Sequence, residues 1–162
     1  MDRYTSAQLY EALAVAETGG EADAFVRTRV NASMGGSTAY GPVQMTGTLV
    51  RDFLRNHTDL FDAVELEYIQ RFLQQSALFA RHGNMRGKLD DYDARYDYGG
   101  PGCLAESGQD RRLYRLVAER IIGYCYGVAE FDLDRFIRRW RGVAEPEDPR
   151  YYAAVHKKLE TL

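Results

Sequence analysis

A glutamate, Glu17, lies where the buried face of an amphipathic helix should continue. The apolar residues before it recur at helical steps: Leu9, Ala12, Leu13 and Ala16. Because Glu17 comes four residues after Leu13, it stays close to that face, and Gly19 and Gly20 then end the helix. A carboxyl group at a helix end, turned toward the core, should have a raised pKa. It could keep a proton near neutral pH, as a general acid requires.

A second polar segment, residues 37–46, offers further groups. Gly41 and Pro42 fix a tight backbone course, and the Gln44 amide supplies both a donor and an acceptor. That amide could hold the N-acetyl group of a sugar or orient a water molecule. Thr46 could place a catalytic hydroxyl nearby, or it could be the N-cap of the next helix. On spacing alone, a purely structural hairpin that ends in this cap is an equal interpretation.

Tyrosines and thiols are the remaining groups of interest. Tyr92, Tyr96 and Tyr98 could line a sugar groove, or they could simply cover the loop that contains them. The three histidines are scattered, without the spacing of a metal site, so we expect no metal and no cofactor. The two cysteines, Cys103 and Cys125, are too few for a disulfide scaffold and are expected to be reduced.

The elements that position these residues are mostly helical. The first helix is expected over residues 6–17 with Ser6 as its N-cap. Clusters of Gly, Ser, Thr and Asn over residues 20–45 are typical of loops with a small hairpin or irregular sheet. Further helices are predicted over residues 46–56, 59–82, 113–124, 133–140 and 150–159, with an irregular segment over 83–108. The chain is therefore predicted to be a single α+β domain, 1–162, predominantly α-helical, with a small sheet after the first helix.

The bulk composition excludes several classes of protein. The 162 residues suffice for one domain with a core, and a net charge of -3 argues against broad binding to nucleic-acid phosphates. No apolar run approaches the roughly 20 residues of a membrane span, and the first residues lack the apolar core of a signal peptide. We therefore expect a protein that is made and folded in a cytoplasm.

Two of these segments resemble motifs of one enzyme superfamily. Glu17-Thr18-Gly19, at a helix end, looks like the Glu-Ser-Gly motif of soluble lytic transglycosylases and goose-type lysozymes. Gly41-Pro42-Val43-Gln44-Met45 looks like the Gly-x-x-Gln-apolar motif of that superfamily. The two motifs in this order also resemble bacteriophage peptidoglycan-degrading domains, either endolysins or virion-associated enzymes. The resemblance covers about residues 8–50.

The resemblance implies a lysozyme-like fold and cleavage of the β-1,4 bond between N-acetylmuramic acid and N-acetylglucosamine in peptidoglycan. Glu17 would be the catalytic acid, and Gln44 would help to hold the substrate. Ser37 or Thr46 would be a further polar contact. The predicted substrate-binding residues are Ser37, Tyr40, Gln44, Tyr96 and Tyr98.

The chain also departs from the pattern of the superfamily. The step from Glu17 to Gln44 is 27 residues (44 minus 17), longer than is usual in the transglycosylases. The later Tyr-Asn-Ala-Gly element of the superfamily has two possible counterparts. One is the segment 96–102, which has the better sequence. The other is the pair of segments 139–142 and 151–155, which has the better position near the C-terminus.

A second carboxylate would decide the reaction. Two-carboxylate hydrolysis needs an Asp or Glu about 5 to 9.5 Å from the acid. Asp23 is the nearest candidate along the chain and Asp97 the next, although a solvated loop charge is the commoner role for such residues. Lytic transglycosylases need no second carboxylate, because the C6 hydroxyl of the muramic acid attacks internally. Hydrolysis and transglycosylation both remain open at this point.

Two other functions compete with the enzyme. The same fold could serve as a non-catalytic wall-binding or structural part of a phage particle or secretion system. The arginines around Trp140 could instead bind nucleic acid, which the acidic pI of about 5.6 disfavours. The enzyme hypothesis predicts a monomer that binds glycan strands of peptidoglycan. It would reside in a host cytoplasm before release to the periplasm and cell wall, or in a virion.

Overall fold

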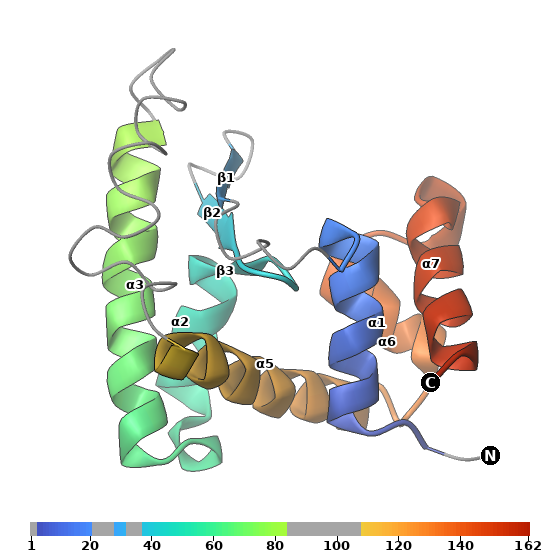
Figure 1. Ribbon diagram of the computed structural model, residues 1–162, viewed down its shortest axis with the longest axis horizontal. Helices are drawn as coiled ribbons and strands as arrows, with labels where there is room; N and C mark the ends of the chain where they lie inside the picture. The colour runs from blue at the N-terminus through green and yellow to red at the C-terminus, as the bar shows by residue number, and fades with distance from the viewer. Residues whose placement is uncertain (1–2, 21–27, 32–36, 84–107) are drawn as a thin grey trace.

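A computed structural model describes residues 3–20, 28–31, 37–83 and 108–162, which form six α-helices and one small antiparallel sheet (Figure 1). The first elements are α1 (Ser6–Thr18), β1 (Thr28–Asn31), β2 (Ser37–Tyr40), β3 (Met45–Thr46) and α2 (Gly47–Asn56). They are followed by the 3-10 helix η3 (Thr58–Leu60), α3 (Ala63–Gly83), α5 (Gly108–Val128), α6 (Leu133–Arg141), the 3-10 helix η4 (Glu145–Glu147) and α7 (Pro149–Glu160). A predominantly helical chain with a small sheet after the first helix is thus confirmed.

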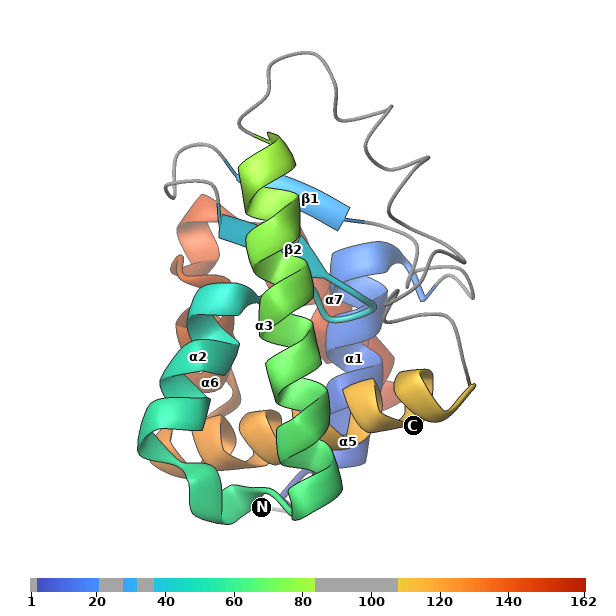
Figure 2. The ribbon, with the colours of Figure 1, turned by 90° about the vertical axis from the view of Figure 1, so that its left-hand side faces the viewer.

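Helix α5 connects the two sides of this arrangement. It lies across the ends of α1 and α3 and packs against both (Figure 1). On one side, α7 packs along α1, with α6 close by. On the other side, α3 covers β2 and also contacts α2, as the view turned by 90° shows (Figure 2). The C-terminal end of α1 therefore lies between the sheet and α7.

Helix α1 begins and ends with regular caps. Its N-cap is Thr5 rather than the predicted Ser6, because the Thr5 hydroxyl accepts from the Gln8 backbone amide while the Gln8 side chain accepts from the Thr5 amide. Its C-cap is Gly19, which has the left-handed φ of 71° that a glycine adopts without cost. The predicted stop at the glycine pair is confirmed.

The sheet is anchored to the helices at one end. Its strand order is β1-β2-β3, and Tyr40 pairs with Thr28 on one side and Met45 on the other. The side chains of Tyr40 and Met45 are buried. Tyr114 of α5 is fully buried, and its hydroxyl donates a 2.7 Å hydrogen bond to the Tyr40 carbonyl. This bond fixes the inner end of the sheet over α5.

Helix α3 begins later than the predicted residue 59. The chain first forms η3, and a reciprocal pair of hydrogen bonds then starts the helix: the Asp62 amide donates to Glu65 Oε1, and the Glu65 amide donates to Asp62 Oδ1. Glu65 is 1% exposed, and Arg120 of α5 pairs with its other oxygen at 2.7 Å. A carboxylate that is buried with all these partners has a structural role.

The other helices match their predictions closely, except that α5 runs from Gly108 to Val128 rather than over 113–124. Pro149 opens α7 as predicted. The predicted irregular segment 83–108 lies outside the described residues apart from its two ends. Among the described residues, no helix combines the length and the apolar character needed to cross a bilayer.

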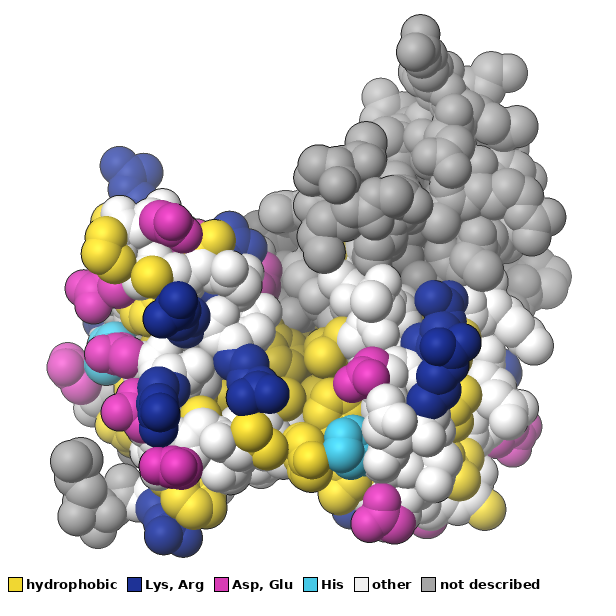
Figure 3. Space-filling view, turned by 180° about the vertical axis from the view of Figure 1, so that it is seen from behind, with side chains coloured by type: hydrophobic (Ala, Val, Ile, Leu, Met, Phe, Trp, Pro, Cys, Tyr) yellow, Lys and Arg dark blue, Asp and Glu magenta, His cyan; other side chains and the backbone are white. Residues whose placement is uncertain are grey.

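The core lies where α1, α3, α5 and the sheet meet. Its largest fully buried side chains are Tyr68, Tyr114, Phe72, Phe136, Leu9, Leu13, Met45, Ile69 and Ile121. Seen from behind, hydrophobic side chains gather in a hollow between the two sides of the molecule (Figure 3). On the side that carries α6 and α7, basic and acidic side chains are interspersed in that view. Arg135 and Glu130 form one ion pair on this side.

Candidate active site

Glu17 lies in the last turn of α1 and is largely shielded from water. The residues one turn earlier, Leu13 and Ala14, are buried, and Gly19 ends the helix by donating to the Ala14 and Val15 carbonyls. The Glu17 side chain is 9% exposed. The prediction that this side chain points toward the interior rather than into water is therefore confirmed.

Two residues from the C-terminal part of the chain contact the Glu17 carboxylate. The Tyr151 hydroxyl donates a 2.8 Å hydrogen bond to Glu17 Oε1. Arg141 Nη1 lies 3.8 Å from Glu17 Oε2. The same guanidinium donates from Nε to Asp148 Oδ2 at 2.9 Å, and its central carbon lies 4.8 Å from the centre of the Tyr151 ring. Tyr151 thus holds Glu17 by a hydrogen bond and Arg141 attracts it by charge, while Arg141 is itself held by the Asp148 carboxylate.

The connection between α6 and α7 brings these partners together. Arg141 is the last residue of α6, and Gly142 ends that helix with a φ of 86°. Asp148 is the N-cap residue of α7 and Tyr151 lies in the first turn of that helix. Because α7 packs along α1, this first turn meets the end of α1 that carries Glu17. The short connection between the two helices therefore places Arg141 and Tyr151 beside the Glu17 carboxylate and Asp148 beside Arg141.

The hydrogen bond between Tyr151 and Glu17 involves one of the two predicted tyrosine segments. Tyr151 belongs to the C-terminal alternative, segment 151–155, and its hydroxyl reaches Glu17. Tyr96 and Tyr98, which belong to the other alternative, lie outside the described residues, as do Asp23 and Asp97. The structure therefore describes only the C-terminal alternative.

Opposing effects act on the proton of Glu17. Burial disfavours the ionised carboxylate, whereas the Tyr151 hydrogen bond and the Arg141 charge favour it. Burial also raises the pKa of Tyr151 well above its ordinary value, and the nearby Glu17 carboxylate raises it further. The Tyr151 hydroxyl therefore keeps its proton throughout the neutral range and remains a donor to Glu17.

The second motif is joined directly to the end of α1. The Thr18 hydroxyl contacts the Pro42 carbonyl at 3.0 Å, as well as the Ala14 carbonyl of its own helix at 2.9 Å. The turn is closed by Gln44, whose backbone amide and side-chain amide both donate to the Gly41 carbonyl, at 3.0 and 2.8 Å. The Thr18 side chain and the Pro42 carbonyl thus bring the two motifs into contact.

Gln44 shows two signs of local strain. Its φ is 54°, in the left-handed region that residues other than glycine rarely adopt. Its side-chain Oε1 is buried and accepts no hydrogen bond from the residues that the structure describes. Strained backbone and unsatisfied polar atoms are concentrated at functional sites. Both observations favour a binding role for this turn.

Two other predicted site residues have a capping and a packing position, and a third begins a strand. Thr46 is the N-cap of α2, because its hydroxyl accepts from the Leu49 amide at 3.1 Å, as the structural interpretation predicted. Tyr40 is 3% exposed and packs edge-on against Phe72 and Tyr114, so it lies in the core rather than on a groove. Ser37 begins β2 and pairs with Asn31 in the strand register.

Sequence reasoning missed Arg141 and Asp148 as site residues. Arg141 was named only within the segment 139–142 and among the arginines around Trp140, without a contact to Glu17, and Asp148 was not considered. An Asp directly before Pro149 is a signal for a helix start, which could have placed its carboxylate at the N-terminus of α7. Among the described residues, no group of three or more His, Cys, Asp or Glu side chains is placed to hold a metal ion.

Cys125 offers a prediction that is independent of the site. It is buried in α5, and burial raises the pKa of its thiol from 9.0 to about 11. At pH 8 the thiolate fraction is then about 100-fold smaller than for an exposed thiol. In a Cys103→Ser background, iodoacetamide should modify Cys125 at least tenfold more slowly in the native protein than in 6 M urea. Equal rates in the two conditions would contradict this packing.

Comparison with protein-family models, with curated proteins and with solved structures finds no match for this chain.

Proposed function

We propose that the chain is a peptidoglycan-degrading glycosidase with a lysozyme-like fold, in which Glu17 is the general acid. One observation carries the proposal: a carboxyl group that is 9% exposed closes α1 and accepts a hydrogen bond from Tyr151. The bond between Thr18 and Pro42, which joins the two motifs, supports it further. In this hypothesis, a glycan strand binds at the C-terminal end of α1, between the Glu17 carboxyl group and the turn that carries the Gln44 amide.

The proposed reaction begins with proton transfer. Glu17 would protonate the oxygen of the β-1,4 bond between N-acetylmuramic acid and N-acetylglucosamine as that bond breaks, while positive charge develops on the muramic acid ring. The Tyr151 hydroxyl and the Arg141 cation both favour the carboxylate that this transfer leaves behind. Their contacts would therefore help Glu17 to release its proton, at the expense of a smaller protonated fraction before the reaction.

The fate of the muramic acid ring distinguishes two enzyme classes. Attack by water would give a reducing muramic acid end, and attack by the C6 hydroxyl would give a 1,6-anhydro end. Asp23 and Asp97, the proposed second carboxylates for hydrolysis, are outside the described residues. The masses of the soluble products therefore separate a muramidase from a lytic transglycosylase, since an anhydro end is lighter by one water.

The same contacts also favour a second candidate function. A buried carboxylate paired with Tyr151 and Arg141 could simply join α1 to α7 in a non-catalytic, wall-binding part of a phage particle or secretion system. The two functions are separated by incubating the protein with insoluble peptidoglycan. An enzyme lowers the turbidity and releases soluble fragments. A binding domain sediments with the wall and leaves the turbidity unchanged.

Tyr151→Phe should reduce wall degradation by about tenfold or more while preserving the fold. The substitution keeps the ring in contact with Arg141 but removes the donor to Glu17, so the carboxylate loses its fixed orientation. Tyr152→Phe is the matched control, because it removes a similar bond, from the Tyr152 hydroxyl to the Val143 carbonyl at 2.7 Å, on the same helix. Both variants should lose about 1 kcal/mol of stability. Equal activity in the two variants would refute a role for Tyr151 at the site.

A further inference from the structure

Arg141 is the one described residue that contacts Glu17, Asp148 and Tyr151 at the same time. Its Nε is bound by Asp148, its Nη1 faces Glu17, and its Cζ lies over the Tyr151 ring. An arginine has a rigid planar fork, so fixing one edge of the guanidinium also fixes where the other edge points. A side chain that is 40% exposed would otherwise sample many rotamers.

The two distances show that Asp148 binds the Arg141 guanidinium more closely than Glu17 does. The contact with Asp148, at 2.9 Å, is a hydrogen bond, whereas the contact with Glu17, at 3.8 Å, is a longer charge interaction. Asp148 therefore competes with Glu17 for the same cation. Loss of Arg141 and loss of the Asp148 charge should consequently shift the pH at which Glu17 loses its proton in opposite directions.

We propose that Arg141 is a positioning residue for Glu17, and that Asp148, by holding it, sets how strongly the cation favours the ionised carboxylate. An effect of Arg141 on catalysis rests on the proposed function, but the electrostatic coupling between Arg141 and Glu17 does not. Of the described residues, the ionisable groups at Glu17 are Arg141 from α6 and Tyr151 and Asp148 from α7. The turn 41–44 that packs on the other side contributes none.

The direction of each effect follows from charge. Arg141→Gln removes the cation, so Glu17 should keep its proton to a higher pH than in the unmodified protein. Asp148→Asn removes the competing negative charge, while the amide oxygen can still accept from Arg141 Nε, so the Glu17 carboxyl group should lose its proton at a lower pH. If the substitutions only disrupted the α6–α7 connection, the midpoint of the Glu17 titration would shift in the same direction in both variants.

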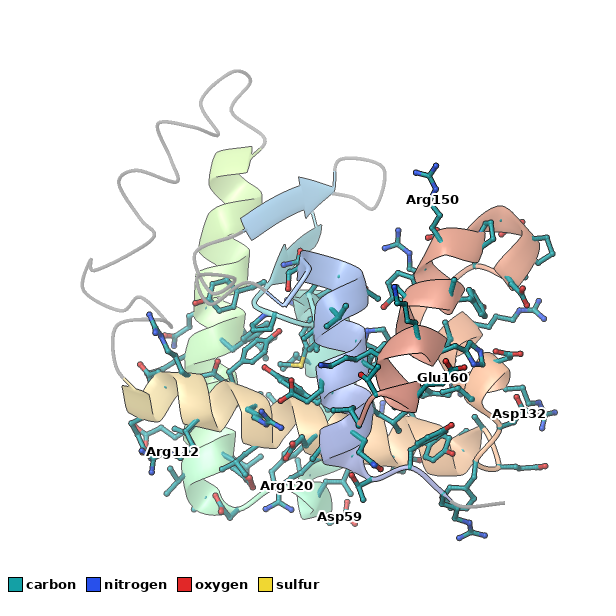
Figure 4. The ribbon with its side chains drawn as sticks, turned by 45° about the vertical axis from the view of Figure 1, so that its right-hand side comes forward. Asp59, Arg112, Arg120, Asp132, Arg150 and Glu160 are labelled. Carbon is teal, nitrogen blue, oxygen red and sulfur yellow. The ribbon has the colours of Figure 1, made fainter. Side chains whose placement is uncertain are left out.

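A cation that does not contact Glu17 serves as the matched control. Arg150 lies in the first turn of α7, next to Tyr151, and its side chain extends away from the protein (Figure 4). Arg150→Gln removes the same charge as Arg141→Gln, from the first turn of α7 instead of the last turn of α6. It should leave the Glu17 titration almost unchanged, because an exposed charge at a distance is screened by solvent.

The experiment is an NMR titration of side-chain carboxyl carbons in protein labelled with ¹³C-glutamate, with the Glu17 signal assigned by its loss in Glu17→Gln. The midpoint should rise by roughly 0.5 to 1 pH unit in Arg141→Gln and fall by a smaller amount in Asp148→Asn. In Arg150→Gln it should stay within roughly 0.2 pH units. Circular dichroism establishes that each variant is folded.

Two results would overturn the proposal: an unchanged midpoint in Arg141→Gln, or shifts of the same sign in Arg141→Gln and Asp148→Asn. If Arg141→Gln does not fold, Arg141→Lys replaces it, because lysine keeps the charge but loses the planar fork. Its midpoint should then lie above that of the unmodified protein. The titration needs no substrate, so its outcome is separate from the activity of Glu17→Gln, which tests the proposed function itself. If both proposals hold, the alkaline limb of wall degradation should move with the Glu17 midpoint in each variant.

Discussion

Glu17→Gln is expected to reduce degradation of purified peptidoglycan by roughly 100- to 10,000-fold while leaving the fold intact. The glutamine has almost the same shape, and its amide oxygen can still accept the hydrogen bond from Tyr151. It has no acidic proton, so the leaving oxygen of the glycan would depart without protonation. The measurement is the initial rate of turbidity loss and of release of soluble fragments.

Glu11→Gln is the matched control for this variant. Glu11 lies on the same helix and also faces an arginine, because Arg115 Nη1 lies 2.6 Å from its Oε1. Its side chain is 41% exposed, so the pair contributes little to stability. This variant should therefore retain nearly full activity. Equal activity of Glu17→Gln and Glu11→Gln would exclude Glu17 as the acid, and loss of activity in both would point to damage to the helix.

Gly41→Ala is expected to lower the free energy of unfolding by about 2 to 5 kcal/mol. A Cβ at this position would overlap Cζ of Tyr114. The Tyr114 ring cannot move away easily, because it is fully buried and its hydroxyl donates a hydrogen bond to the Tyr40 carbonyl. The φ of 82° adds a conformational cost for any side chain. Urea unfolding followed by tryptophan fluorescence and circular dichroism measures the change.

Gly19→Ala separates the two causes of this loss. Gly19 has a similar φ of 71°, but a Cβ there would meet no described atom within 4 Å. Its substitution should therefore cost only the conformational part, about 1 kcal/mol. If Gly41→Ala were no more destabilising than Gly19→Ala, the close packing of the turn on Tyr114 would be wrong. The turn also carries Gln44, so wall degradation should fall in Gly41→Ala.

Local patterns predicted much of the first third of the chain. The helical spacing before Glu17 and the glycines after it were sufficient to place its side chain toward the interior, and Thr46 was foreseen as a cap. These features depend on residues a few positions apart, where backbone geometry alone sets the outcome. The start of α3 was predicted too early, because the reciprocal bonds of Asp62 and Glu65 were not recognised as a capping box.

Contacts between distant segments were harder to predict. Tyr151 was foreseen as one of two alternatives, but nothing in the spacing of the sequence shows that α7 packs along α1. The roles of Arg141 and Asp148 depend on that packing and on the turn between α6 and α7. Tyr40 was expected at the substrate because of its motif, whereas the strand register turns its side chain into the core.

The most direct test of the account is mass spectrometry of the soluble fragments released from purified peptidoglycan by the unmodified protein and by Glu17→Gln. If Glu17 is the general acid, the unmodified protein should release fragments that end in muramic acid, either reducing or 1,6-anhydro, and the variant almost none. The same fragments in equal yield from Glu17→Gln, or fragments cut only within the peptide stems, would contradict it.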